Sequence, residues 1–322
     1  MTLTKEINLK VLPIRSWDRL NKLRPFVKRI LRLPGLRLLR STAKRVEAVA
    51  KPAGQLFVRF NPIKKIKQNQ HTVTILSANL WHDWPRHRRL RERIDSFAQL
   101  VEKHKADILL LQEVARIPNL RSDEWLAERL GMAYLYSRAN GHADAIGFEE
   151  GLAVFSRYPL KKLYLQQWDI SISPFGRRLA LGAKLDTPMG ELMAFSVHLS
   201  PMQRQNMRQV KYLRDWVVSL AGNRSALVGG DFNVHEDAHQ ITQAQYSWLD
   251  TFRAINPSGG GTTHAIRCPI NGNAIRRKRL DYIFLHSSAQ RWRVISAKHV
   301  DSPHGPHSDH RAVLAKLLPQ RV

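Results

Sequence analysis

The sequence predicts an α/β fold in which two β-sheets pack against each other and helices lie outside them. Many strand-like segments follow residue 71, and helical segments are grouped between them, which is the pattern of a layered fold. The predicted strand 107–114 contains the continuous apolar run 108–111, typical of a strand that is buried on both faces. With 322 residues, of which 43% are hydrophobic, the chain can form one large domain and an appendage.

Residues 1–70 carry more than half of the excess positive charge. They hold 18 Lys and Arg against 3 Asp and Glu, a net charge of +15, whereas the whole chain has +26. A basic amphipathic helix is predicted within residues 16–50 from apolar side chains at helical spacing: Leu20, Leu23, Val27, Ile30 and Leu31. It can lie on an anionic membrane surface, dock on the main domain or contact nucleic acid. We therefore predict a helical extension with a linker over 1–70, and a domain over 71–318.

The domain is predicted to begin with a strand at 72–76 and a helix at about 86–104. Pro85 favours the helix start, and the apolar residues of the helix share one face. After the buried strand 107–114, a helix is predicted near 122–130. Turn residues and apolar segments then predict a run of strands: 132–137, 151–156, 160–168, 178–186 and 191–198.

A third helix is predicted at 203–220, because Met207, Val210, Leu213 and Val217 form an apolar stripe. The short apolar segment 226–230 follows as a buried strand. Residues 234–278 are predicted to be rich in loops, since they contain a glycine run and few apolar periods. The remaining predicted strands are 280–286, 292–300 and 311–317.

Composition restricts the cellular setting and the partners. Cys268 is the only cysteine, so an intramolecular disulfide is impossible, and a reducing compartment is expected. No apolar run approaches the length that spans a membrane. A net charge of +26 attracts polyanions, either nucleic acid or an anionic membrane face. We predict a cytoplasmic protein, located peripherally on the membrane face if residues 16–50 bind lipid.

Several predicted strands end in side chains that can bind metal or phosphate: Asn79, Glu113, His198, Asp231, Asn233, Asp281, Asp309 and His310. Asp231 and Asn233 follow the strand 226–230 and are two residues apart, so on extended backbone they point to the same side. The carboxylate can take a cation or a proton, and the amide can donate to a phosphate oxygen. Each residue alone has an ordinary structural explanation. Their joint occurrence beside apolar strands favours a catalytic site.

Seven short motifs in order make residues 71–318 similar to the endonuclease/exonuclease/phosphatase superfamily of DNase I-like phosphoesterases. The motifs are Ser-Ala-Asn79-Leu, Leu-Leu-Gln-Glu113-Val, Gly151-Leu-Ala-Val-Phe-Ser-Arg-Tyr-Pro159, Ser-Val-His198-Leu, Gly-Gly-Asp231-Phe-Asn233, Arg279-Leu-Asp281-Tyr-Ile-Phe and His-Ser308-Asp309-His310. The resemblance implies a four-layer α/β sandwich that hydrolyses phosphoric esters with a divalent cation, usually Mg²⁺, with Mn²⁺ as a substitute.

The resemblance also implies the ligands of the cation and a catalytic pair. Glu113 would be the principal Mg²⁺ ligand, with Asn79 and Asp309 as further ligands, and oxygen donors of this kind suit Mg²⁺. His310 and Asp281 would form a dyad in which the carboxylate orients the imidazole. Whether His310 takes the proton of water or polarises the phosphate stays open.

The remaining implied roles concern the water and the phosphate. Asp231 would orient or deprotonate the attacking water, and Asn233 and His198 would donate to the phosphoryl oxygens. A zinc site built from His304, His307 and His310 is disfavoured, because the prolines and glycine between them prevent a regular helix.

The substrate is less closely specified. A phosphodiester in nucleic acid is favoured, a membrane phospholipid or head-group phosphate is the alternative, and a non-catalytic polyanion-binding module is disfavoured because every ligand position is filled. Trp81 and His82 can stack on a base or a head group, or pack internally. The basic run 276–279 can meet phosphates or form a solvated turn.

Overall fold

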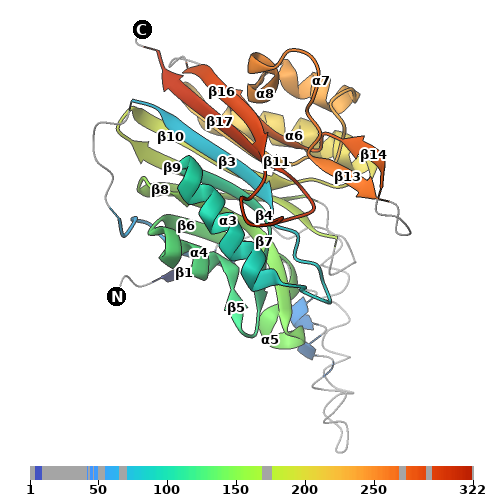
Figure 1. Ribbon diagram of the computed structural model, residues 1–322. Coiled ribbons are helices and arrows are strands. Elements are labelled where there is room, and N and C mark those ends of the chain that lie inside the picture. The colour runs from blue at the N-terminus through green and yellow to red at the C-terminus, as the bar shows by residue number, and fades with distance from the viewer. Residues whose placement is uncertain are drawn as a thin grey trace, which may run out of the picture.

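Two β-sheets packed face to face form the centre of the computed structural model (Figure 1). The structure describes residues 4–8, 42, 44–45, 47–49, 55–64, 71–168, 176–267, 273–287 and 292–320. In this part of the chain the larger sheet has nine strands. Across that sheet they are β1 (Lys5–Asn8), β2 (Gln55–Arg59), β6 (Ala133–His142), β7 (Phe148–Ser156), β4 (Ile108–Ile117), β3 (Val73–Asn79), β17 (Ala312–Pro319) and β16 (Trp292–Val300), with β5 (Leu120–Arg121) paired to β4.

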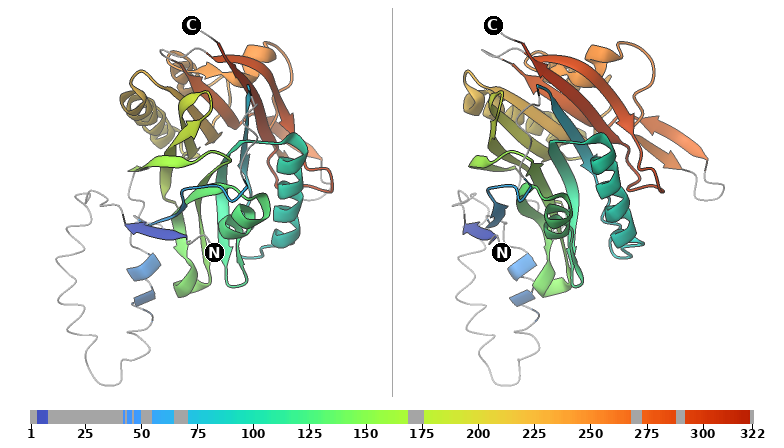
Figure 2. Two further views of the ribbon diagram at one scale, coloured as in Figure 1. Left: turned by 90° about the vertical axis from the view of Figure 1, so that its left-hand side faces the viewer. Right: turned by 60° about the vertical axis from the view of Figure 1, so that its left-hand side comes forward.

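The second sheet has six strands within the described residues, and a two-stranded ribbon stands out beside it (Figure 2). The six are, in order, β12 (Leu249–Asp250), β15 (Asp281–His286), β11 (Ser225–Asp231), β10 (Gly190–His198), β9 (Arg178–Thr187) and β8 (Leu160–Trp168); the ribbon is β13 (His264–Arg267) and β14 (Ala274–Lys278). The helices are α3 (Leu90–His104), α4 (Ser122–Leu130), α5 (Ala143–Ile146), α6 (Gln203–Ala221), α7 (His239–Gln245) and α8 (Thr251–Ile255).

Three clusters of buried apolar residues lie between the layers and hold them together. One lies between the sheets and joins residues such as Ile75 and Leu110 to Leu181 and Leu227. A second joins the outer face of the larger sheet to α3 and α4, and a third joins the second sheet to α6 and α7. The apolar stripe of α6 predicted from sequence faces this third cluster, except that Met207 is exposed. The predicted four-layer α/β sandwich is therefore confirmed.

In two segments the structure shows helices or strands that the sequence did not predict. Residues 55–59, placed in the N-terminal extension, form β2 and pair antiparallel with β6 in the larger sheet. Residues 234–278, expected to be rich in loops, contain α7, α8 and the β13–β14 ribbon. Both segments are short and gain their order from pairing or packing with distant parts of the chain, which local periodicity does not report.

The predicted helix within 16–50 lies mostly outside the described residues, as does Cys268. Of that segment only residues 42, 44–45 and 47–49 are described, and they are helical. The domain boundary at residue 71 and the membrane contact of 16–50 stay predictions. Among the described helices, none is long and apolar enough to cross a membrane.

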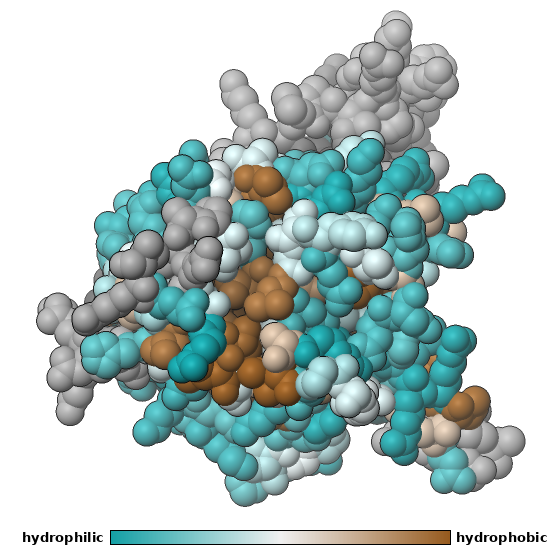
Figure 3. Space-filling view, turned by 90° about the horizontal axis from the view of Figure 1, so that it is seen from above, coloured by the Kyte–Doolittle hydropathy of each residue, from teal (hydrophilic) through white to brown (hydrophobic). Residues whose placement is uncertain are grey.

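The end of the sandwich that faces up in Figure 1 carries apolar side chains between hydrophilic ones (Figure 3). A cavity of about 650 Å³ lies there, lined in part by Trp248, Leu285 and Trp292. Because β3 pairs antiparallel with β17, with Val73 beside Leu317, this is the end where β3 starts. None of the site residues predicted from sequence lines this cavity. The chemistry therefore has to be sought at the opposite end, where β3, β4, β10 and β11 finish.

Arg279 belongs to the fold rather than to a phosphate contact. Its guanidinium is buried and donates to both oxygens of Asp250, at 2.8 and 2.7 Å, and to Glu236 at 3.0 Å. Arg276 and Arg277 on the same ribbon are exposed. The basic run 276–279 therefore contains one residue that stabilises the fold, Arg279, and two that face solvent, Arg276 and Arg277.

We expect Arg279→Leu to lower the free energy of unfolding by about 3–5 kcal/mol, because Asp250 would be left buried without its cation. Urea unfolding at neutral pH measures this loss. Arg276→Ala is the matched control and should change the free energy of unfolding by less than about 0.5 kcal/mol. A loss from Arg279→Leu no larger than that of the control would show that the ion pair is not needed for stability.

Candidate active site

Three of the predicted catalytic side chains lie at one level across neighbouring strands. The register pairs His198 at the end of β10 with Asp231 at the end of β11, and Asp231 with Asp281 at the start of β15. Gly230 allows this close approach, since a Cβ at that position would lie 1.9 Å from the main-chain oxygen of Val197. The Gly-Gly pair before Asp231 therefore serves strand packing as well as the turn that follows.

Glu113 reaches the same level from the larger sheet through a β-bulge. The register of β4 with β7 shifts between Leu111 and Val114, and Glu113 has a φ of 53°. A bulge re-aims a side chain that regular alternation would place elsewhere, and a left-handed backbone at glutamate is uncommon and strained. The Nδ2 of Asn79 donates to Oε1 of Glu113 at 3.0 Å and to Oδ2 of Asp231 at 3.2 Å. One amide thus joins carboxylates from the two sheets.

The dyad predicted from sequence is present. His310 Nδ1 and Asp281 Oδ2 are 2.8 Å apart, and both residues are buried. The main-chain N–H of His310 donates to the Ser308 hydroxyl at 3.1 Å, which orders the loop before β17. Burial alone lowers the pKa of His310, but the carboxylates of Asp281, Asp231 and Asp309 outweigh it and raise the pKa to about 10. The imidazole is therefore protonated at neutral pH.

The carboxyl of Asp231, unlike the His310 imidazole, has a pKa close to neutrality. Burial, followed by the charge of Asp281, raises the pKa of Asp231 to about 7. Its Oδ1 accepts the N–H of Asn233 at 2.8 Å. The pKa of His198 is well below its usual value because of burial and the neighbouring Arg178, so the two residues facing each other at 3.6 Å are a neutral imidazole and a titratable carboxyl.

These residues surround a pocket of about 210 Å³, hereafter the catalytic pocket. Of the predicted residues, Glu113, His198, Asp231, Asn233 and His310 line it. Asn79 and Asp281 adjoin it through their hydrogen bonds. Asp309 is exposed and instead lines a separate groove, where it groups with His264 and His310. The structure thus brings together seven of the eight predicted residues.

Three further residues line the catalytic pocket: Glu150 and Arg178, which sequence reasoning did not single out, and His82, for which it offered only stacking or internal packing. The Nη1 of Arg178 is 3.0 Å from Nε2 of His198. The main-chain N–H of His82 donates to Oε2 of Glu113 at 3.2 Å, and its ring Nε2 is 3.4 Å from the same oxygen. Neither Glu150 nor Arg178 carries a local signal, because each lies within an ordinary strand; the signal available for His82 was its position three residues after Asn79.

The oxygen donors of the catalytic pocket suit a divalent cation. Glu113 and Asp231 direct carboxylate oxygens toward the Asn79 amide. The pKa of the buried Asp231 carboxyl is raised in part by the charge of Asp281, and a bound cation would offset this negative charge. In the present arrangement Asn79 presents Nδ2 to the carboxylates while its Oδ1 accepts the N–H of Trp81 at 2.9 Å. Its role as a metal ligand therefore stays a prediction.

The histidines considered for zinc lie apart. The ring of His307 is buried against Phe97, with 5.6 Å between ring centroids, and its Nδ1 is 3.0 Å from the Ser302 hydroxyl. His304 is exposed. His299, upstream of these three, stacks on Phe252 with 4.1 Å between ring centroids. The expectation that the His304, His307 and His310 spacing does not form one face agrees with this geometry.

Solved structures with the same fold cover about three quarters of the chain. An endonuclease/exonuclease/phosphatase family protein from Leptotrichia buccalis C-1013-b is 20% identical, covering 76% of this chain and 99% of its own, with a TM-score of 0.63. An endonuclease/exonuclease/phosphatase from Bacteroides vulgatus is 20% identical, covering 78% and 100%, with a TM-score of 0.61. D. rerio TDP2 in complex with a single-strand DNA product is 16% identical, covering 77% and 99%, with a TM-score of 0.61.

No curated protein matches the chain in sequence. The model of the endonuclease/exonuclease/phosphatase family matches residues 76–310, a span that runs from β3 to His310. It includes every site residue predicted above. The chain therefore belongs to the endonuclease/exonuclease/phosphatase family, and it is a metal-dependent phosphoric ester hydrolase.

Proposed function

We propose that this protein is a Mg²⁺-dependent phosphodiesterase that acts on nucleic acid. The observation that carries the proposal is a groove of about 810 Å³ that begins at His310 and runs along the β13–β14 ribbon. This ribbon groove is several times larger than the catalytic pocket of about 210 Å³. A phosphate monoester or small head group would need the pocket alone, whereas a polymer needs a path that leads away from it.

The lining of the ribbon groove includes aromatic, apolar and cationic side chains that suit a nucleic-acid strand, together with two carboxylates, Asp301 and Asp309. Trp81 lines the groove, as do Ile266 and Arg277 of the ribbon. Aromatic and apolar surfaces stack on bases, and cations hold the phosphates between them. The net charge of +26 adds a long-range attraction for any polyanion. D. rerio TDP2, which shares the fold, was solved with a single-strand DNA product, and this supports the same substrate class here.

Glu113, with Asn79, would hold the cation, which when bound neutralises charge on the phosphate and on the leaving oxygen. Asp231 has a pKa near neutrality, so it can accept the proton of an attacking water. His310, kept protonated by Asp281, donates to a phosphoryl oxygen instead of acting as a base. Asn233, His198 and Arg178 line the pocket wall and can stabilise the remaining oxygens.

Hydrolysis assays on three substrates test the proposed function. Full-length protein should cleave a single-stranded oligonucleotide in Mg²⁺, more weakly or equally in Mn²⁺, and not in EDTA. Vesicles that contain sphingomyelin or phosphoinositide should be poor substrates. Faster hydrolysis of either lipid than of the oligonucleotide would favour the alternative, a membrane phospholipid phosphodiesterase or phosphatase that uses the same pocket.

Arg277→Ala is expected to raise the KM for an oligonucleotide about tenfold, because one phosphate contact is lost, while kcat for a small diester such as bis(4-nitrophenyl) phosphate is unchanged. Arg276→Ala is the matched control: it removes the same charge from the same strand but does not line the ribbon groove. Equal effects of both variants would mean that general charge attraction, and not the groove, positions the substrate.

A further inference from the structure

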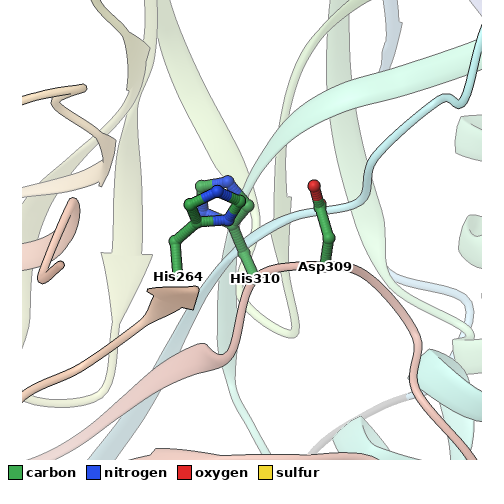
Figure 4. Close-up of side chains that lie close together, drawn as sticks. All are labelled: His264, Asp309 and His310. Carbon is green, nitrogen blue, oxygen red and sulfur yellow. The ribbon is translucent and has the colours of Figure 1, made fainter. Parts of the chain in front are cut away.

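A second cluster of metal-ligating groups lies at the mouth of the catalytic site. His264 begins β13, while Asp309 and His310 lie on the loop that leads into β17. Each can offer one ligand atom, and these atoms all lie within 4.8 Å of one another. In Figure 4 the two imidazole rings overlap, one in front of the other, and the Asp309 side chain rises from the loop beside them. Sequence reasoning did not find this cluster, because His264 is 45 residues before Asp309.

The backbone holds these three side chains in place before any ligand binds. His264 and His310 form an isolated antiparallel bridge. The N–H of Arg311 donates to the carbonyl of Thr263 at 2.8 Å, and the N–H of Thr263 donates to the carbonyl of Lys278 at 2.9 Å. The rings of His264 and His310 lie 4.4 Å apart between centroids, with 33° between their planes. Preorganisation of this kind lowers the entropy that metal binding costs.

The donor atoms are available to an incoming ion. His310 uses Nδ1 for Asp281, at 2.8 Å, so Nε2 is the ring nitrogen left for a ligand. Because the metal-free imidazole is protonated, a metal that binds Nε2 displaces its proton to solvent. A histidine whose second nitrogen is bound to a carboxylate is the usual arrangement around protein-bound metals. The Nδ1 of His264 is buried and has no hydrogen-bond partner within the described residues. Asp309 is exposed in the ribbon groove, which leaves a path from solvent.

We propose that His264, Asp309 and His310 form a site for a transition-metal ion of the zinc class, distinct from the catalytic cation. Two imidazoles and one carboxylate are donors that Zn²⁺ prefers, and with three protein ligands a fourth position stays open for water or a phosphate oxygen. Mg²⁺ prefers oxygen ligands and retained water, so the nitrogen-rich cluster discriminates against it. The carboxylate oxygens of Glu113 and Asp231 instead favour Mg²⁺ over Zn²⁺.

Occupation of this site inhibits the enzyme. His310 is shared between the zinc-class site and the catalytic pocket, and a ring nitrogen that binds a metal cannot also donate to a phosphoryl oxygen. This consequence rests on the proposed function, since it uses the role given there to His310. The metal site itself does not depend on the substrate, and a binding measurement therefore tests it separately.

The binding test uses full-length protein, freed of metal with EDTA and transferred to buffer that contains millimolar Mg²⁺. Zn²⁺ is titrated by calorimetry or against a chromophoric chelator, and Co²⁺ serves as a spectroscopic probe through its visible absorption. We expect one Zn²⁺ per chain despite the Mg²⁺. His264→Gln should weaken Zn²⁺ binding by at least about tenfold, the range known for losing even an outer-shell partner. Asp309→Asn, at an exposed position, should weaken binding similarly if His264→Gln proves unstable.

Two controls locate the ion. His304→Gln removes an exposed imidazole from the same loop, and Glu113→Gln removes the main oxygen donor of the catalytic pocket; both should bind Zn²⁺ as the wild type does. A wild-type chain that binds no Zn²⁺ in the presence of Mg²⁺ would overturn the proposal. Unchanged Zn²⁺ affinity in folded His264→Gln and Asp309→Asn would overturn it as well.

The activity arm compares each protein with itself, as the ratio of rates with and without micromolar Zn²⁺ in Mg²⁺. In the wild type, micromolar Zn²⁺ should slow hydrolysis at least about tenfold. In His264→Gln the ratio of the two rates should stay close to one, because this variant has lost affinity for Zn²⁺. Equal inhibition of both proteins would overturn the inhibitory role. Should the protein bind Zn²⁺ but hydrolyse no substrate in Mg²⁺, the proposed function would fail while the metal site would stand.

Discussion

Replacing Glu113 by Gln is expected to slow phosphodiester hydrolysis by roughly 10³-fold or more, because loss of the cation removes several kcal/mol of stabilisation of the developing charge. The residue is held at the catalytic pocket by a bulge and a φ of 53°, which suggests that the fold tolerates strain to place this carboxylate. Initial rates on the oligonucleotide over a range of Mg²⁺ concentrations measure the effect.

The fold should survive the Glu113→Gln substitution, since the side chain lies at the pocket and not within an apolar cluster. Thermal unfolding in EDTA checks this, with Glu102→Gln as the control for an exposed glutamate on α3. The control should keep full activity. If Glu113→Gln turned over substrate at close to the wild-type rate, the principal ligand of the cation would have to be another residue.

His310→Ala is expected to slow hydrolysis by about 10²- to 10⁴-fold, and Asp281→Asn should approach that loss. The two side chains are 2.8 Å apart and buried together, so they act as one unit. The double variant should therefore be little slower than the slower single variant. Rates for all four proteins on one substrate form the cycle that measures the coupling.

A second measurement separates positioning from general disruption. Asp281 is a main cause of the raised pKa of His310, about 10 against an ordinary value of 6.5, so Asp281→Asn should lower it. NMR titration of the imidazole in wild type and variant reads this shift directly. Losses that multiply in the double variant, together with an unchanged pKa, would show that Asp281 serves some purpose other than orienting His310.

Much of the architecture could be predicted because it depends on local patterns. The apolar run 108–111 produced the buried core of β4, and the stripe of Val210, Leu213 and Val217 produced the buried face of α6. The site residues were predictable for a related reason: each lies at or near one end of an apolar strand, and strands whose ends meet at one edge of a sandwich bring those residues together. The short strand β2 was missed because its order comes from pairing with β6.

Contacts between distant segments were outside the reach of sequence patterns. Arg178 and Glu150 lie within ordinary strands, and they reach the catalytic pocket only because β9 lies beside β10 and β7 lies beside β4. The basic run 276–279 looked uniform, yet Arg279 turns inward to Asp250 while Arg277 faces the ribbon groove. Charge alone does not tell which side chain is buried, because burial follows from the partner that the fold supplies.

The sequence by itself determined the layered α/β fold, the family and seven of the residues at the catalytic pocket, since periodicity and short motifs are local properties of the chain. Only the tertiary structure decided that Asp309 faces the ribbon groove and His264, that Asn79 bridges carboxylates of both sheets, and that the pKa values of Asp231 and His310 are both raised. The physical reason is that distances, burial and pKa values depend on groups far apart in sequence, whose proximity exists only after the sheets have packed.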